Sequence, residues 1–391
     1  MREAQICPIV LQSVSDYLPL TERWLFHQLE GVRPYCESNT VCERLVPGSP
    51  YDTASVHCFR KRRIRSLADR TMRWMGHPEW MRAKPKLAVE LRANIVHSHF
   101  ADLAWSDRGV ARQASAAHVV SVYGYDVSAL PSRSQKWRQR CAQLFHTVDL
   151  VLCEGPVMAG RVQSLGCMRS KIEVHHLGVP SGRIAYRQPH REAVQPFRVL
   201  MAGSFTEKKG LPIGLRAVAL LGRKFPVAVT IIGDSNGSRG QNREKAEIMQ
   251  TIANEGLGAA VKLLGYQPYE RLLAEFYEHD VFLCPSMTAR DGDSEGGAPV
   301  TLMEVAASGL PIVATRHADI PYVLDQGACG LLAPERDAAT LAQCLEAVAR
   351  SQRLAAELSR KARRRVEAEF DQAVQGRRLF TVYQRLLERL A

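Results

Sequence analysis

Long apolar runs, repeats and export signals are absent from this 391-residue sequence. No stretch approaches the roughly 18 uninterrupted apolar residues that a membrane-spanning helix needs. No short repeat or low-complexity segment occurs, and 46% hydrophobic residues is the composition of a folded chain. The N-terminus lacks a signal-peptide pattern, because Glu3 and Gln5 precede a short apolar run that Asp16 soon ends. We therefore expect a cytoplasmic protein of two or three domains.

Several ligand-binding signatures are absent as well. The ten cysteines form no Cys-x-x-Cys pair and have no paired spacing with histidine, so we expect neither a zinc site nor a disulfide framework. No strand is followed by G-x-G-x-x-G, the fingerprint of a dinucleotide-dependent dehydrogenase. No helix-turn-helix signature, RRM-like motif or aromatic stacking series accompanies the basic residues. The cysteines are therefore predicted to be buried apolar residues in a reducing compartment.

Basic residues are in excess, with 52 Lys and Arg against 40 Asp and Glu and a formal net charge of +12. Charge alone does not choose between nucleic acid, an anionic membrane and a phosphorylated substrate. The excess is uneven, because 27 of the 52 basic residues but only 17 of the 40 acidic residues lie in residues 1–195. The first half of the chain is therefore the expected place for an anionic partner.

Short apolar, β-branched runs recur along the chain, and each ends in a Gly, Pro or polar turn. In the first half they occupy residues 6–14, 94–100, 118–123, 149–153 and 172–177, and in the second half 198–202, 227–232, 261–264, 281–284 and 312–315. Helical spacing occurs at 211–225, 243–255, 269–278, 300–308 and 338–349. Continuous apolar strands alternating with helices predict an α/β fold with two Rossmann-like, doubly wound parallel sheets.

A composition shift marks the boundary between the two halves. Residues 178–196 contain three prolines and no apolar periodicity, as expected of a linker. We place an N-terminal domain with its linker at 1–195, a C-terminal domain at 196–365, and a last helix at 366–391 that packs back on the first domain. Two facing parallel sheets would form a cleft, since ligands bind outside the carboxyl ends of parallel strands.

The sharpest chemical signal is Asp291-Gly-Asp-Ser-Glu-Gly-Gly-Ala-Pro-Val-Thr-Leu-Met-Glu304. A strand ends before this Gly-rich loop, and a helix opens near its proline. Free N–H groups at a helix N-terminus favour an anion such as a pyrophosphate, and Gly296 and Gly297 allow a ligand to approach closely. Thr301 and Glu304 stand in the first turns of this helix, where a carboxylate is placed to accept hydrogen bonds from a ribose diol.

This segment resembles the donor-site signature of the retaining glycosyltransferases of family 4, also called group 1 glycosyltransferases. They are two-domain GT-B enzymes that use nucleotide sugars without a metal. The strand Gly309-Leu-Pro-Ile-Val-Ala-Thr315 matches the family pattern. The family has seven residues between its two glutamates, whereas eight separate Glu295 from Glu304 here. The resemblance implies that Glu295 contacts the donor sugar and Glu304 the ribose.

The second family block corresponds to Gly203-Ser-Phe-Thr-Glu-Lys-Lys-Gly210. The resemblance implies that Lys209 faces the donor phosphates, where a fixed cation stabilises the charge that grows as the sugar leaves. The family usually has Arg where Ser204 stands, so one phosphate cation is missing and Lys208 is the candidate to replace part of it. Gly203 and Gly233, each at the end of a predicted strand, match positions where the nucleotide lies close to the backbone.

In the first half, His97-Ser-His-Phe100 and the segment from residue 119 to 128 resemble strand-end motifs that face the cleft. Most family members place His at the position of Tyr123. A phenol donates a hydrogen bond but does not become a cation near neutral pH. We therefore consider Tyr123 and His99 as the catalytic candidates here, and Tyr125 and Asp126 as acceptor-side residues.

Residues 16–29 resemble the first loop and helix of colanic-acid-type and capsule-type members, in which Thr21 and Glu22 would face the acceptor. The basic run Arg60-Lys-Arg-Arg-Ile-Arg65 precedes apolar residues on a plausible amphipathic helix. Such a helix can lie on anionic headgroups, each basic residue adding on the order of 1 kcal/mol. An ordinary solvated helix is the alternative.

The resemblance thus implies a metal-independent retaining hexosyltransferase of exopolysaccharide or lipopolysaccharide biosynthesis, peripheral at the inner face of the plasma membrane. Its expected partners are a GDP- or UDP-sugar donor, a lipid-linked saccharide acceptor and the anionic membrane surface, with no cofactor, no metal and no nucleic acid. The alternatives are a GT-B epimerase or hydrolase of nucleotide sugars, and a basic non-enzymatic protein that binds nucleic acid or membrane. A metal site at Asp291-Gly-Asp293 is a further, disfavoured hypothesis, because Asp-x-Asp metal sites belong to single-domain sugar transferases.

Overall fold

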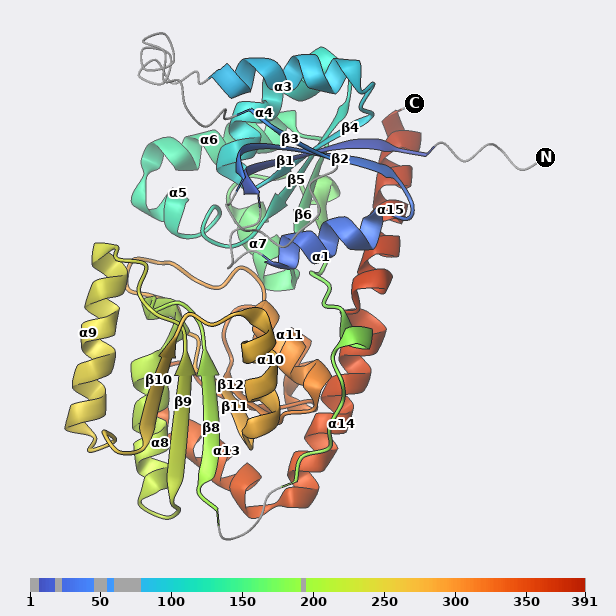
Figure 1. Cartoon of the computed structure of the whole chain (residues 1–391). Coiled ribbons are helices and arrows are strands. Elements are labelled where there is room, and N and C mark those ends of the chain that lie inside the picture. The colour runs from blue at the N-terminus through green and yellow to red at the C-terminus, as the bar shows by residue number, and fades with distance from the viewer. Residues whose placement is uncertain (1–6, 18–22, 46–54, 60–78, 191–194, 391) are drawn as a thin grey trace. The chain divides into compact units, whose positions relative to one another are not determined.

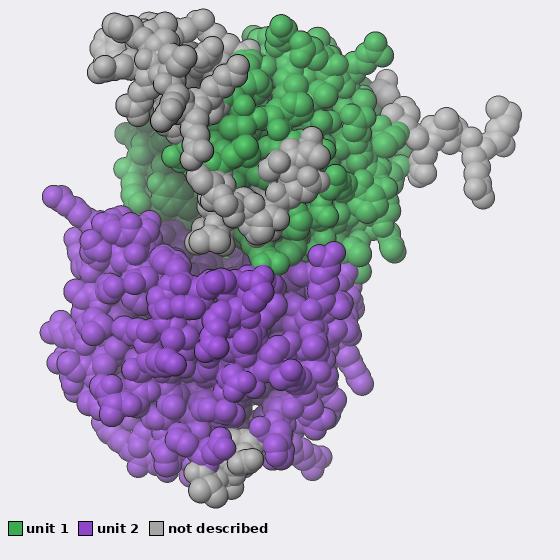
Figure 2. All heavy atoms as spheres, viewed as in Figure 1, with its two compact units in different colours: residues 1–178, 372–391 green, residues 179–371 purple. Residues whose placement is uncertain are grey.

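The chain divides into two compact units, coloured separately in Figure 2. Unit 1 contains residues 1–178 and 372–391, and unit 2 contains residues 179–371. The computed structural model describes residues 7–17, 23–45, 55–59, 79–190 and 195–390, without the side chains of 79–82. Unit 2 is therefore an insertion between two parts of unit 1.

Unit 1 has a seven-stranded sheet in the order β3-β2-β1-β4-β5-β6-β7, and all of its strand pairs are parallel (Figure 1). The strands are β1 (Ile9–Tyr17), β2 (Glu37–Leu45), β3 (Val56–Cys58), β4 (Ile95–His99), β5 (Ala117–Val122), β6 (Leu150–Cys153) and β7 (Ile172–Val174). Every residue of β4, β5 and β6 is buried, because helices cover both faces of the sheet.

The helices of unit 1 pack on opposite faces of this sheet. They are α1 (Arg23–Val32), α3 (Glu79–Glu90), α4 (Ala101–Ala114), α5 (Ala129–Arg133), α6 (Gln135–Thr147), α7 (Pro156–Ser164) and the C-terminal α15 (Gln372–Leu390). Alternate residues of β5 point to different clusters: Val119 packs with Leu379 and Tyr383 of α15, whereas Val120 packs with Leu144 and Phe145 of α6. The last helix of the chain therefore completes the core of the first unit.

Helices α1 and α15 cross with their backbones in close contact. A Cβ atom built on Gly376 would lie 1.9 Å from the carbonyl oxygen of Gly31, and one on Gly31 would lie 2.6 Å from the carbonyl oxygen of Gln372. Only glycine, which has a hydrogen atom in place of a Cβ, fits at either position. This glycine pair therefore sets how closely α15 approaches α1.

Unit 2 has a six-stranded parallel sheet in the order β10-β9-β8-β11-β12-β13. Its strands are β8 (Phe197–Ala202), β9 (Val227–Ile232), β10 (Val261–Gly265), β11 (Val281–Cys284), β12 (Ile312–Thr315) and β13 (Leu331–Ala333). Its helices are α8 (Leu211–Gly222), α9 (Arg239–Asn254), α10 (Tyr269–Glu278), α11 (Val300–Ser308), α12 (Ile320–Val323), α13 (Ala338–Arg350) and α14 (Gln352–Glu369). The predicted pair of doubly wound parallel sheets is present.

The boundary between the units lies before the proline-containing segment rather than after it. Val179 donates its N–H to the carbonyl of Phe370 (2.9 Å), and Arg187 donates to the carbonyl of Ser308 (2.9 Å). The segment expected to link the domains therefore packs along unit 2, from which the chain leaves at Asp371.

Two sequence features can be followed directly in the structure. All ten cysteines lie in the described part of the chain, and none forms a disulfide there. Among the described residues, no helix is both long and apolar enough to cross a membrane. The predicted amphipathic helix at residues 60–75 lies outside the described residues.

Candidate active site

The candidate site lies at the carboxyl ends of the unit 2 strands, where the strand order reverses. β8 is flanked by β9, the next strand in sequence, and by β11, the third strand after β8. The helices leaving β8 and β11 therefore begin on opposite faces of the sheet, and the loops diverge at a topological switch point, the usual ligand position in an open α/β sheet. Lys209 follows β8 and Glu295 follows β11.

Lys209 and Glu295 form an ion pair at this switch point. The Lys209 Nζ lies 2.7 Å from Glu295 Oε1, and the two side chains are 19% and 9% exposed. Ser286, which is buried, donates its hydroxyl to the same Glu295 oxygen at 3.1 Å. The loops after β8 and β11 are thus joined by a charged contact that is largely shielded from water.

Each charge of the Lys209–Glu295 pair offsets the cost of burying the other. Burial alone would raise the pKa of Glu295, but the charges of Lys209 and Lys208 outweigh it and lower this pKa to about 2. Burial alone would lower the pKa of Lys209, and the Glu295 carboxylate reverses that effect and raises it. Lys209 is therefore a permanent cation at neutral pH, as expected of a residue that faces phosphates.

Lys208 is directed to a different part of the same loop. Its Nζ lies 3.3 Å from Asp293 Oδ1 and donates to the carbonyl of Ser294 at 3.2 Å. Asp293 Oδ1 also accepts the N–H of Ser294 at 2.9 Å. These contacts make Lys208 a support for the loop, and they commit an Asp293 oxygen to a lysine. No metal-type grouping of His, Cys, Asp and Glu occurs within the described residues.

The predicted glycines bring the β8 and β9 loops together. A Cβ built on Gly233, where φ is +132°, would lie 1.9 Å from the carbonyl oxygen of Gly203. A Cβ on Gly203 would in turn lie 3.2 Å from Cδ of Lys209, so the lysine side chain passes over this position. Ser204, which replaces the usual arginine, is half-buried beside them.

Helix α11 carries the remaining predicted donor residues. Gly296 and Gly297 precede the helix, Thr301 lies in its first turn and is half-buried, and Glu304 lies in the next turn and is 5% exposed. The N-terminus of this helix carries the positive end of its dipole, which favours an anionic group. The predicted donor residues are therefore grouped around the ends of β8, β9 and β11.

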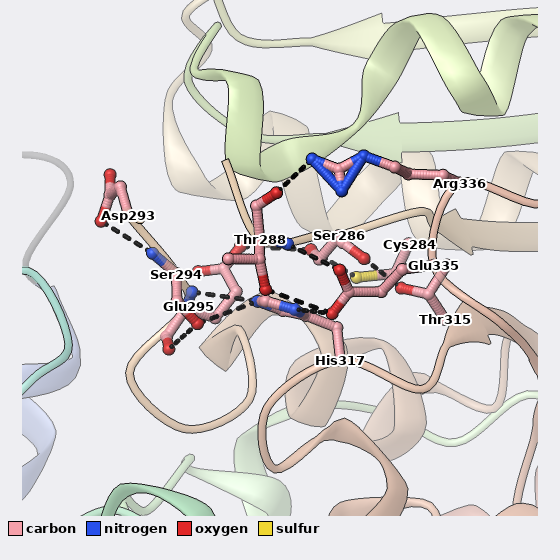
Figure 3. A network of polar contacts seen from close by, with 10 residues as sticks. All are labelled: Cys284, Ser286, Thr288, Asp293, Ser294, Glu295, Thr315, His317, Glu335 and Arg336. Carbon is pink, nitrogen blue, oxygen red and sulfur yellow. Dashed lines mark hydrogen bonds and ion pairs between the residues drawn. The ribbon is translucent and has the colours of Figure 1, made fainter. Parts of the chain in front are cut away.

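Sequence reasoning missed two residues of this site (Figure 3). His317 follows β12, and its Nε2 lies 3.1 Å from the backbone N of Glu295. Glu335 follows β13, and its Oε1 lies 2.6 Å from His317 Nδ1. Neither His317 nor Glu335 was among the site residues predicted from the sequence. The sequence signal that could have identified His317 is its position, since it is a polar residue two positions after Thr315, where a strand was predicted to end.

In unit 1 the predicted strand-end residues form a buried hydrogen-bond chain. His99 Nδ1 lies 2.6 Å from the Tyr123 hydroxyl, and its Nε2 lies 3.0 Å from Gln12 Oε1. His99 is fully buried, and burial lowers its pKa to about 3, so it is neutral. Tyr123 is half-buried, and burial raises its pKa well above 10. The structure therefore places His99 behind Tyr123, where it positions the phenol.

The acceptor-side candidates have different environments. Tyr125 is 44% exposed and stays a prediction. Asp126 is fully buried and accepts the backbone N–H groups of Ala101 (2.9 Å) and Tyr123 (3.0 Å), so in the structure it holds two loops rather than facing an acceptor. Thr21 and Glu22 lie outside the described residues.

Comparison with known proteins connects this geometry to a family. The family pattern described as "Glycosyl transferases group 1" matches residues 182–365, which contain the whole candidate donor site. The chain is 33% identical over 313 residues to WcaL of Escherichia coli K12, whose full name is "Putative colanic acid biosynthesis glycosyltransferase WcaL". The match covers 77% of this chain and 73% of WcaL. The chain belongs to the group 1 glycosyltransferases.

A second relative and two solved structures are also similar to this chain. The amylovoran biosynthesis glycosyltransferase AmsK of Erwinia amylovora is 34% identical over 248 residues, covering 62% of this chain and 58% of AmsK, which is less than two thirds of that protein. Sucrose-phosphate synthase of Thermosynechococcus elongatus has a TM-score of 0.79 at 16% identity, covering 98% and 100% of the two chains. HepE of Anabaena, solved with UDP, has a TM-score of 0.76 at 15% identity, covering 96% and 99%. The predicted GT-B fold is confirmed.

Proposed function

We propose that this group 1 glycosyltransferase moves a sugar from a nucleotide-sugar donor to a hydroxyl of a lipid-linked saccharide, with retention of anomeric configuration and without a metal. The observation that carries the proposal is the shielded Lys209–Glu295 pair at the switch point of unit 2, 2.7 Å between Nζ and Oε1. It provides a fixed cation against the loop that leads into the N-terminus of α11, and a cation and a helix N-terminus are what a diphosphate leaving group requires.

The chain's own residues account for donor binding and departure. Glu304 would accept the ribose hydroxyls, and Lys209 with the N-terminus of α11 would hold the diphosphate. In the transfer step the bond from the anomeric carbon to the phosphate oxygen breaks, and a bond to the acceptor oxygen forms on the same face. The acceptor proton passes to the departing phosphate oxygen, and Lys209 stabilises the charge on the diphosphate.

The proposed acceptor class has two supports. The relatives AmsK and WcaL are named for amylovoran and colanic acid biosynthesis, and both names denote exopolysaccharides. Residues 1–195 hold most of the net positive charge, which suits a pyrophosphate-linked lipid at an anionic membrane. We therefore place the reaction in exopolysaccharide or lipopolysaccharide assembly, at the inner membrane face.

Nucleotide binding tests the donor site without an acceptor. We expect UDP or GDP, but not both equally, to raise the melting temperature, since a ligand at 100 times its dissociation constant adds about 2.7 kcal/mol of stability. HepE is the reason to begin with UDP. Glu304→Gln should weaken binding of the same nucleotide by about 10- to 100-fold, the cost of losing a charged hydrogen bond.

Glu346→Gln is the matched control for Glu304→Gln. Glu346 pairs with Lys224 and Arg350 on the exposed surface of unit 2, so its replacement should leave nucleotide affinity unchanged. Equal affinity of wild type and Glu304→Gln would contradict the donor assignment. Consumption of a nucleotide sugar at an undiminished rate without any acceptor would point instead to a hydrolase or an epimerase.

Metal independence and retention make a separate prediction. Sugar transfer should survive excess EDTA with less than a twofold change, because lysine and helix N–H groups carry the phosphate charge. An NMR spectrum of the product taken before mutarotation should show the anomeric configuration of the donor. Metal independence would be wrong if EDTA abolished activity and added Mg²⁺ or Mn²⁺ restored it. Retention would be wrong if the product had the inverted anomeric configuration.

A further inference from the structure

The segment from residue 285 to 299, here called the donor loop, joins β11 to α11 and carries Glu295. It has no helix or strand of its own, so backbone ladders do not fix it. Its position therefore depends on contacts from neighbouring loops. Three come from the β8 side to the main chain of the loop. Met287 donates its N–H to the carbonyl of Lys208 (2.8 Å), the Lys208 ammonium donates to the carbonyl of Ser294 (3.2 Å), and the N–H of Arg290 donates to Glu207 Oε1 (3.2 Å).

On the other side, one carboxylate holds the beginning of the donor loop. Glu335 Oε2 accepts the N–H of Thr288 at 2.9 Å, and Oε1 accepts the Thr288 hydroxyl at 3.4 Å. The neighbouring Arg336 donates to the carbonyl of Thr288 at 2.5 Å. Both polar groups of the Thr288 backbone are thus paired with the turn after β13 (Figure 3).

The same carboxylate orients His317 toward the middle of the loop. Because Glu335 Oε1 accepts from His317 Nδ1 at 2.6 Å, the ring proton sits on Nδ1 and Nε2 is an acceptor. Nε2 accepts the backbone N–H of Glu295 at 3.1 Å and faces the Ser294 hydroxyl at 3.3 Å. The His317 side chain is 1% exposed, so water does not compete for these contacts.

Glu295 is consequently fixed from both ends. Its main chain is hydrogen-bonded to His317, and its carboxylate is held by Lys209 (2.7 Å) and Ser286 (3.1 Å). A rotation of the Glu295 peptide would move the carboxylate away from Lys209. Catalytic groups must be held in place before the substrate arrives, and a misplacement of about 1 Å can cost on the order of 100-fold in rate.

We infer that His317 and Glu335 are positioning residues for sugar transfer, which fix the main chain of Glu295 so that its carboxylate and Lys209 stay aligned for the donor. This inference rests on the proposed function. Neither residue needs to touch the donor, because each acts through the donor loop. The consequence is that their loss should affect turnover more than nucleotide binding.

Three substitutions of His317 separate the two hydrogen bonds. His317→Gln places an amide oxygen near the former Nε2 and keeps an acceptor for the Glu295 N–H. His317→Asn places its amide near the former Nδ1 and keeps only the contact to Glu335, and His317→Ala keeps neither. We expect kcat to fall by about 10- to 100-fold in the Ala and Asn variants. The Gln variant should stay within about fivefold of wild type, with nucleotide dissociation constants within about threefold in all three.

Hydrogen exchange gives a readout that does not depend on activity. The backbone N–H of Glu295 should be protected in wild type and His317→Gln and should exchange faster in His317→Asn and His317→Ala. Ser351→Ala is the matched control, because it removes the side chain that caps α14 in the same unit (Ser351 Oγ to Leu354 N, 3.2 Å) and lies on no donor-loop contact. Its melting temperature should fall while kcat and Glu295 exchange stay as in wild type.

The outcomes separate this inference from the proposed function. Equal kcat and equal Glu295 exchange in wild type and His317→Ala would overturn the positioning role, as would Gln and Asn variants that behave alike. If wild type neither binds UDP or GDP nor transfers a sugar while the exchange pattern follows the prediction, the loop contacts are correct and the proposed function fails. If His317→Ala lowered the melting temperature without changing kcat, His317 would contribute to stability and not to positioning Glu295.

Discussion

Replacing Lys209 by methionine is expected to lower kcat by about 100- to 1,000-fold, the usual effect of removing one group that stabilises transition-state charge. Methionine keeps much of the apolar stem that passes over Gly203 and removes only the charge. The loss should fall on kcat because the diphosphate is most negative as the sugar departs. Steady-state kinetics with a saturating donor would measure it.

The same substitution leaves Glu295 without its main charge partner, which gives a pH signature. In wild type the pKa of Glu295 is lowered from 4.5 to about 2, so its favourable contribution to stability is present above pH 4.5 and is lost as the pH falls toward 2. Without Lys209, less charge opposes the effect of burial, so this pKa should be higher than in wild type. The stability difference between wild type and Lys209→Met should therefore be largest near neutral pH and shrink on acidification, as measured by urea unfolding at several pH values.

Lys224→Met is the control for this prediction. Lys224 pairs with Glu346 at 2.7 Å on an exposed face of the same unit, where ion pairs contribute little. Its kinetics should match those of wild type. A Lys209→Met enzyme with more than a third of the wild-type kcat would show that the cation beside the diphosphate is another residue.

Gly376→Ala should destabilise unit 1 by about 3 kcal/mol, the upper end of the usual cost of overpacking. The added Cβ would lie 1.9 Å from the carbonyl oxygen of Gly31 and 2.1 Å from its carbonyl carbon. These are backbone atoms of α1, which do not move aside as the end of a flexible side chain does. Helix α15 must therefore shift from its place, which also disturbs the packing of Tyr383 and Leu379.

The control is the same substitution in another helix of unit 1. Gly160 lies in α7, and a Cβ there meets nothing within 4 Å. Gly160→Ala should therefore be neutral or add up to about 1 kcal/mol of stability, because alanine favours helix. Urea unfolding and the exchange of α15 amides compare the two variants. Equal unfolding free energies would mean that α15 does not depend on the glycine contact.

The sequence predicted the central strands β11 and β12 of unit 2 well because every residue of both is buried. The apolar runs at 227–232, 281–284 and 312–315 coincide with β9, β11 and β12. The strands β2, β3 and β13 were missed. In β2 only the middle of the strand is buried, and β3 and β13 have three residues each, so none has the long apolar run that marks a central strand.

The candidate site was predicted in its residues but not in its connections. Lys209 and Glu295 were identified by resemblance to family motifs, yet their ion pair joins residues that are 86 positions apart in sequence. The extra residue between Glu295 and Glu304 gave no indication of how Glu295 would be held. His317 and Glu335 supply that contact from two further loops, and such a juxtaposition depends on strand order, which periodicity does not reveal.

The interrupted course of unit 1 has a consequence for synthesis of the chain. Residues 1–178 leave the ribosome before unit 2, but the sheet face formed by Val10, Ile95 and Val119 is covered by Leu379, Val382 and Tyr383, which are made after unit 2. Unit 2 is complete before α15 exists. The nascent protein must therefore carry an uncovered apolar surface on residues 1–178 until α15 has been synthesised, and this interval is when it is most exposed to aggregation and most dependent on chaperones.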